Sequence, residues 1–90
     1  MNVIVELTGT LVARTGARRA HVAVPEDATV ADVIDTLAAE YGPQVRAGVL
    51  DGEHLRSDTV VVRESADAAE PVSPASPVTA GDTVRFRLAS

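Results

Sequence analysis

Segments near both ends of the chain alternate apolar and polar residues with the period of a β-strand. Asn2–Leu7 has valine or leucine at every second position, and Thr83–Leu88 does the same with Val84, Phe86 and Leu88. Successive side chains of a strand point to opposite faces, so each segment can bury one face and expose the other. We expect these segments to be the first and last strands of the fold.

Two more segments, Ala20–Val24 and Thr59–Arg63, are rich in valine and also predict strands. The stretch "TGTLVARTGARR" between the first two strands contains two glycines and reads as a turn. A connection this short predicts an antiparallel pair. Asp51-Gly52 is a tight-turn signal between the helical and the third-strand regions.

The clearest helical pattern covers Thr29–Tyr41. Its apolar residues recur at intervals of three and four along one stripe, formed by Val30, Val33, Ile34, Leu37, Ala38 and Tyr41. Thr29 suits the N-cap position, and Asp32 three residues later completes a variant of the capping box. Gly42 and Pro43 then end the helix, because proline cannot continue it.

The stretch "ESADAAEPVSPASP" is rich in alanine, serine, proline and acidic residues. It offers few side chains to bury, and its prolines remove backbone donors that strand pairing needs. We therefore expect residues 64–77 to be a mobile loop within a single domain of residues 1–90.

The order of these elements predicts a ubiquitin-like β-grasp. This is an α+β fold with a mixed sheet of four to five strands and one main helix on one face. A right-handed crossover would place the first and last strands side by side and parallel at the centre of the sheet.

Composition narrows the possible functions. The 90 residues carry a net charge of −5, every basic residue is arginine, and there is no cysteine. Disulfides, thiolate catalysis and cysteine zinc sites are thereby excluded. The acidic balance argues against a nucleic-acid or anionic-membrane partner. No apolar run has the length of a membrane span, and the N-terminus does not resemble a signal peptide, so we expect a cytoplasmic protein.

No arrangement of residues indicates catalysis, a cofactor or a metal site. His21 and His54 lack a shared metal-ligand spacing, the serines have no nucleophile motif, and no glycine-rich phosphate loop is present. The acidic residues around Asp51 and Asp58 are typical of a solvated turn. We expect a protein that is not an enzyme.

Arginines dominate the polar side of the last strand. Arg85 and Arg87 alternate with core residues and should point away from the helix, where Arg63 and Glu6 could join them. Two interpretations stay open for this face: a solvated surface, or a docking surface for a partner protein, since arginine is enriched in interfaces.

Three stretches in order resemble a known family: "TLVARTG", "VPEDATVADVIDTLAAEYGP" and "SPVTAGDTVRF". Together they are similar to the MoaD/ThiS family of small sulfur carriers, which includes the small subunit of molybdopterin synthase and the thiamine-pathway sulfur carrier. A Gly-Asp pair, here Gly81-Asp82, commonly precedes the last strand in this family. Glycine tolerates positive φ in a tight turn, and aspartate can hydrogen-bond the turn backbone.

The resemblance implies a β-grasp that docks onto a larger activating or cofactor-handling enzyme in molybdopterin or thiamine-type cofactor biosynthesis. Family members carry sulfur as a thiocarboxylate on a C-terminal Gly-Gly. Here Ala89 and Ser90 follow the last strand, so we expect docking rather than the usual thiocarboxylate formation. Two alternatives remain open: a functional sulfur carrier with an atypical C-terminus, and a nucleotide- or RNA-binding β-grasp module.

Overall fold

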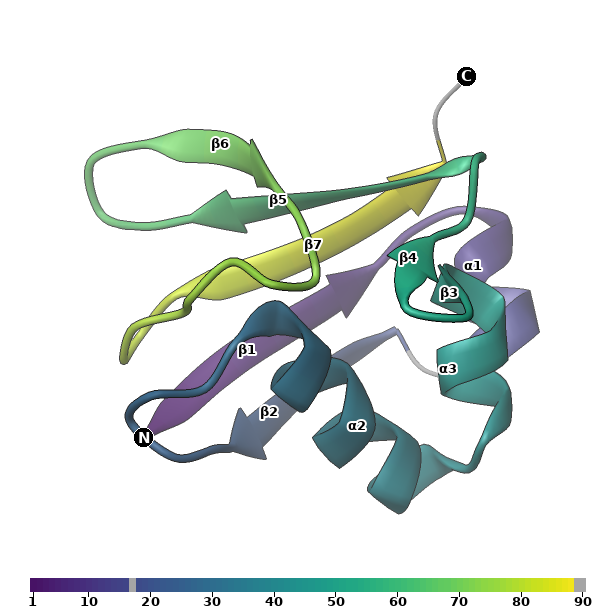
Figure 1. Cartoon of the computed structure of the whole chain (residues 1–90), viewed down its shortest axis with the longest axis horizontal. Helices are drawn as coiled ribbons and strands as arrows, with labels where there is room; N and C mark the ends of the chain where they lie inside the picture. The colour runs from purple at the N-terminus through teal and green to yellow at the C-terminus, as the bar shows by residue number, and fades with distance from the viewer. Residues whose placement is uncertain (17, 89–90) are drawn as a thin grey trace.

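The computed structural model describes residues 1–16 and 18–88, and its main sheet has five strands in the order β2-β1-β7-β5-β6 (Figure 1). These strands are β1 (Asn2–Leu7), β2 (Arg19–Ala23), β5 (Thr59–Glu64), β6 (Ala69–Val72) and β7 (Thr83–Leu88). A two-stranded sheet joins β3 (Leu50–Asp51) to β4 (His54–Leu55). The helices are α1 (Thr10–Thr15), α2 (Val30–Tyr41) and α3 (Gln44–Val49).

β1 and β7 pair in parallel at the centre of the sheet, with Val5 beside Val84 and Leu7 beside Phe86. β2 runs antiparallel to β1, and β5 runs antiparallel to β7. The first and last strands therefore lie side by side, as the order of elements predicted. With α2 packed on one face, this is a ubiquitin-like β-grasp, and the predicted fold class is confirmed.

The inward residues of the strands and of α2 form one apolar cluster. Its largest fully buried members include Phe86, Leu11, Ile34 and Leu37. On β1 the buried positions alternate with exposed or half-buried ones, as the period of two predicted. Thus the same alternation that buries one face of the sheet leaves the other face to solvent.

α2 has the bounds and the N-cap that the sequence predicted. The Thr29 N–H donates to Asp32 Oδ2 at 2.9 Å, and the Asp32 N–H donates to Thr29 Oγ1 at 3.4 Å. Gly42 follows the helix with φ of 116°, a conformation that favours glycine. Tyr41 departs from the predicted stripe, because 40% of it is exposed.

The stretch "TGTLVARTG", expected to be a turn, contains the short helix α1. Leu11 of this helix is fully buried, and Thr15 Oγ1 donates to the Leu11 carbonyl at 2.7 Å. α1 packs closely on α3, where a Cβ added to Gly48 would lie 2.9 Å from Thr15 Cγ2. Isolated six-residue helices are unstable in water, so this helix depends on its tertiary contacts.

The segment 64–77, expected to be a loop, contains strand β6, which pairs with β5 from Glu64↔Ala69 to Val61↔Val72. Pro71 is tolerated there because β6 is an edge strand, where one side of the backbone needs no donor. The expectation of irregular structure is therefore wrong for residues 69–72. The mobility of the segment stays a prediction.

After β6, residues 73–78 form what we call the strap, which crosses the N-terminus of α2. The Val30 N–H donates to the Ser76 carbonyl and the Ala31 N–H to the Pro74 carbonyl, each at 2.9 Å. The first N–H groups of a helix have no partner within it, so the strap satisfies donors that would otherwise need water. This long-range cap was not visible in the local sequence pattern.

Candidate functional site

The face of the main sheet opposite α2, here called the open face, is the candidate site. The alternation of the strands and their register assign it the following side chains: Ile4, Glu6, Arg19, His21, Val60, Val62, Glu64, Ala69, Pro71, Thr83, Arg85 and Arg87. All of them are exposed or half-buried, in contrast to the buried residues that alternate with them on the central strands.

A row of ion pairs crosses the open face. Arg85 Nη2 lies 3.1 Å from Glu6 Oε2 and 3.0 Å from Glu64 Oε1, so one guanidinium bridges two carboxylates. Arg19 Nη1 approaches the other oxygen of Glu6 at 3.6 Å. Glu64 Oε1 is buried and makes no directed hydrogen bond among the described residues, although it lies within ion-pair distance of Arg85. The row neutralises most of the charge at the centre of this face.

Apolar side chains lie beside this row. Ile4, Val60 and Val62 are half-buried, and Pro71 is exposed. Val62 lies between Arg85 of β7 and Pro71 of β6 in the strand register. We call these four residues the apolar patch. Apolar groups next to arginines, on a face that no helix covers, are the combination found at protein–protein interfaces.

Two of the predicted docking residues lie on the open face as expected. Arg87 is opposite Val60 in the register, is exposed, and makes no ion pair with the described residues. Arg85 is in the ion-pair row, with 40% of its side chain exposed. Ala89 and Ser90, the predicted C-terminal tail, lie outside the described residues.

Arg63 does not join Arg85 on the open face. It has the same strand parity as the buried Thr59 and Val61 and therefore points to the covered side. Its guanidinium donates to the Pro77 carbonyl at 2.7 Å, which attaches the strap to β5, and it pairs with Glu70 of the neighbouring strand β6. Its docking role stays a prediction, but its contacts in this structure are those of a residue that links the strap to the sheet.

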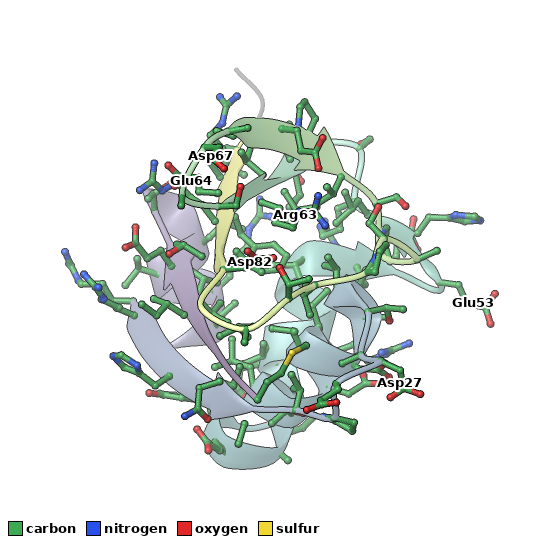
Figure 2. The ribbon with its side chains drawn as sticks, turned by 90° about the vertical axis from the view of Figure 1, so that its left-hand side faces the viewer. Asp27, Glu53, Arg63, Glu64, Asp67 and Asp82 are labelled. Atoms are coloured by element: carbon green, nitrogen blue, oxygen red, sulfur yellow. The ribbon has the colours of Figure 1, made fainter. Side chains whose placement is uncertain are left out.

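The Gly81-Asp82 turn has the structure that the sequence suggested. Gly81 has φ of 84°, and Asp82 Oδ2 accepts from both the N–H and the Oγ1 of Thr79 at 2.9 Å. Asp82 is 3% exposed, and Arg63 Nε lies 3.9 Å from its carboxylate (Figure 2). The Ile4 N–H donates to the Asp82 carbonyl, so this turn sets the start of β7 beside β1.

A second cluster, missed in the sequence, joins α1 to the start of β5. Arg14 Nη2 donates to Asp58 Oδ2 at 2.8 Å, and Thr59 Oγ1 donates to Asp58 Oδ1 at 3.0 Å. These hydrogen bonds, first that from Arg14, lower the pKa of Asp58 to about 2, and the same pair raises the pKa of Arg14. The expected solvated acidic turn thus retains Asp51 and Glu53, whereas Asp58 is ion-paired.

The described residues contain no group of three or more histidine, aspartate or glutamate side chains that could hold a metal ion. In the same residues, no helix has the length and apolar character needed to cross a membrane. The arrangement on the open face offers binding contacts, namely an apolar patch, an ion-pair row and the exposed Arg87.

Solved structures with the same fold cover nearly all of the chain. SAMP1 from Haloferax volcanii is 24% identical, with a TM-score of 0.81 over 100% of this chain and 97% of that one. A chain of the Amycolatopsis orientalis BexX/CysO complex is 22% identical, with a TM-score of 0.79 over 98% and 96%. The putative molybdopterin converting factor subunit 1 from Pyrococcus furiosus is 19% identical, with a TM-score of 0.73 over 99% and 98%.

No protein-family model and no curated protein sequence matches the chain. The structural matches confirm, at the level of the fold, the resemblance to small ubiquitin-like sulfur carriers that the sequence motifs suggested.

Proposed function

We propose that this chain is a non-enzymatic ubiquitin-like protein that acts by docking onto a larger protein through its open face. The observation that carries this proposal is the apolar patch, of which Val60 lies opposite Arg87 in the strand register. Ile4, Val60 and Val62 stay partly exposed on a face that the fold could cover only by binding something else. An interface would remove these side chains from water and use the arginine at its rim.

The comparisons support a protein as the partner. One structural neighbour comes from a BexX/CysO complex, which joins two proteins, and another is called a molybdopterin converting factor subunit. By analogy, the partner of this chain is an activating or cofactor-handling enzyme. The analogy rests on the shared fold.

A functional sulfur carrier in molybdopterin or thiamine-type cofactor biosynthesis is the second candidate. The structural match to a molybdopterin converting factor subunit favours it. Both candidates require the same docking event, because a sulfur carrier must also bind the enzymes that load and unload it. They differ in whether the C-terminus of the chain is chemically modified.

The docking proposal is tested by site-specific cross-linking in an extract of the source organism. A benzophenone amino acid replaces Val62 on the open face in one variant, and the exposed Ala39 of α2 in the matched control. We expect one large protein to be cross-linked through position 62 but not through position 39. Equal products from both positions, or none from position 62, would contradict docking through the open face.

Intact mass of the chain recovered from its native host separates the two candidates. A sulfur carrier predicts a population in which one C-terminal oxygen is replaced by sulfur, whereas a docking protein without sulfur transfer predicts an unmodified chain. Cross-linking through position 62 is expected in either case. The mass therefore tests the chemistry independently of the docking face.

A further inference from the structure

The arginines of this acidic chain are concentrated near one end of the sheet. β1 and β7 end there and β2 begins there, on the right-hand side of Figure 1. The Leu7 N–H donates to the Arg18 carbonyl at 2.8 Å, which places Arg18 beside the end of β1. Arg19 lies opposite Glu6, and the Thr8 N–H donates to the carbonyl of Phe86, the residue before Arg87.

We call Arg18, Arg19 and Arg87 the arginine corner. Arg18 and Arg19 line, together with Glu6, Leu7 and Thr8, an open hollow of about 250 Å³. Arg87 follows on the other side of Thr8, because β1 and β7 are adjacent. All three arginines are exposed. The hollow can therefore receive a side chain from outside, next to Arg18 and Arg19.

Among residues 1–16 and 18–88, little negative charge compensates the arginines of the corner. Arg18 and Arg87 make no ion pair with the described residues, and the 3.6 Å partner of Arg19 is Glu6, which Arg85 already holds at 3.1 Å. Together with Arg85 of the neighbouring row, this surface carries four arginines but only two carboxylates, those of Glu6 and Glu64. This surface is net positive in a protein whose net charge is −5.

Unpaired acidic residues lie at the opposite end of the strands. Glu26 and Asp27 occupy the connection from β2 to α2, and Asp67 occupies the turn from β5 to β6. Figure 2 views the molecule from this end and shows Asp27 and Asp67 well apart at its margins. None of the three makes an ion pair with the part of the chain that the structure describes. These three acidic residues are thus separated from the arginine corner along the strand direction.

We propose that the arginine corner binds an acidic segment of the partner protein, whose aspartate or glutamate carboxylates contact Arg18, Arg19 and Arg87. This inference rests on the proposed docking function and names the chemistry of one part of its interface. Guanidinium groups suit carboxylates because their N–H donors match the two oxygens. The charge separation would also orient the chain, corner first, as it approaches an acidic surface.

An extended polyanion such as RNA fits this surface less well. Binding along a nucleic acid requires a basic stripe that follows several phosphates. Here the basic surface is confined to one corner, and Asp51, Glu53 and other unpaired acidic residues lie elsewhere on the chain. A short acidic peptide can contact the corner without approaching them.

The test titrates the isotope-labelled full chain with a short glutamate-rich peptide and follows its amide chemical shifts at low and at physiological salt. We expect shifts confined to residues around Thr8, Arg18, Arg19 and Arg87, with an affinity that falls as salt rises. A peptide with glutamine in place of glutamate should produce no such shifts. An RNA oligonucleotide of similar length, binding more tightly than the glutamate peptide, would overturn the proposal.

The matched variants are Arg18→Gln with Arg87→Gln, and Arg46→Gln with Arg56→Gln outside the corner. Both pairs change the net charge equally. The corner pair should weaken peptide binding roughly tenfold, as expected for the loss of two exposed ion pairs, while the control pair should change it little. Equal weakening in both pairs, unchanged binding in the corner pair, or no binding by the unmodified chain would each overturn the proposal.

Cross-linking distinguishes failure of this inference from failure of the docking function. If a partner is cross-linked through position 62 and the corner variant captures it equally well at low salt, docking stands and the acidic contact is wrong. If no partner is cross-linked through position 62, the docking proposal itself fails.

Discussion

Arg63 and Arg85 lie on neighbouring strands, and each is held by two carboxylates, but they serve opposite faces of the sheet. Arg63 has 24% of its side chain exposed, ties the strap to β5 through the Pro77 carbonyl, and pairs with Glu70 of β6 and with Asp82. Arg85 is 40% exposed and bridges Glu6 and Glu64 on the open face. Residue type therefore does not decide whether an arginine links two segments of the fold or lies on its surface. Strand parity decides this, because it determines whether the side chain points toward the strap or toward the open face.

The covered face holds the fold together, so breaking it should have the largest effect. Leu37→Ala removes a fully buried side chain from the cluster under α2 and should lower the free energy of unfolding by about 2–5 kcal/mol. The matched change on the open face, Val62→Ala, removes a half-buried side chain and should cost less than about 1 kcal/mol. Urea unfolding of both variants measures the difference, and equal costs would show that the two faces are equivalent.

Arg63 and Arg85 should differ in the same way: removing Arg63, on the covered side, should lower the free energy of unfolding more than removing Arg85, on the open face. Arg63→Ala removes the hydrogen bond to the Pro77 carbonyl and leaves the buried Asp82 carboxylate without its nearby cation. We expect a loss of about 1–3 kcal/mol in the free energy of unfolding.

Arg85→Ala breaks only partly exposed ion pairs and should cost at most about 1 kcal/mol. Urea unfolding of both alanine variants is the measurement. A larger loss for Arg85 than for Arg63 would contradict this expectation.

Arg87 should contribute to docking but little to the stability of the fold. Arg87→Glu changes an exposed side chain without an ion pair to the described residues, so the free energy of unfolding should change by no more than about 0.5 kcal/mol. Capture of the cross-linked partner should fall roughly tenfold, because charge reversal at a rim opposes association. Arg85→Glu is unsuitable as a docking test, since it would place three carboxylates together.

Amide exchange can locate the boundary between the ordered and the mobile part of residues 64–77. The Ala31 N–H, bonded to the Pro74 carbonyl of the strap, should exchange slowly because α2 and the strap protect it together. Amides of Ala66 and Asp67, at the tip of the β5–β6 turn, should exchange fast. Slow exchange at the tip would contradict the predicted mobility, and fast exchange at Ala31 would show that the strap opens.

The smallest expected effect is the pH dependence from Asp58. Its pKa is about 2 in the folded chain against an ordinary value of 3.8, because Arg14 and Thr59 hydrogen-bond the ionised carboxylate. The stabilisation is therefore complete above pH 3.8 and is lost as the pH falls from there through about 2. In acid unfolding, Asp58→Asn should differ from the unmodified chain at neutral pH and converge with it in strong acid.

Elements with a strong local pattern were predicted well. β1, α2, β5 and β7 have bounds within one residue of those expected, because alternation, helical spacing and the Thr29 cap are recorded in adjacent residues. The Gly81-Asp82 turn was likewise foreseen from the conformational freedom of glycine and the hydrogen bonding of aspartate.

The elements that were missed are short and depend on distant partners. α1 is stabilised by burying Leu11 and by contact with α3, and β6 exists through its pairing with β5. Neither has enough local apolar pattern to be distinguished from a turn or a loop. The candidate site is predictable in part: alternation places Arg85 and Arg87 on the face away from the helix, whereas Arg18 and Arg19 lie in a stretch whose sequence predicts only a turn.

By itself, the sequence determined the fold class, the face of each long element that is buried, and the outward direction of Arg85 and Arg87. These properties follow from the periodicity of side chains along a strand or a helix, which is local. Only the tertiary structure decided that Arg63 fastens the strap, that Arg85 is shared by two carboxylates, and that Arg18, Arg19 and Arg87 meet at one corner. Such groupings depend on strand register and on chain segments that are far apart in sequence, and no local pattern records them.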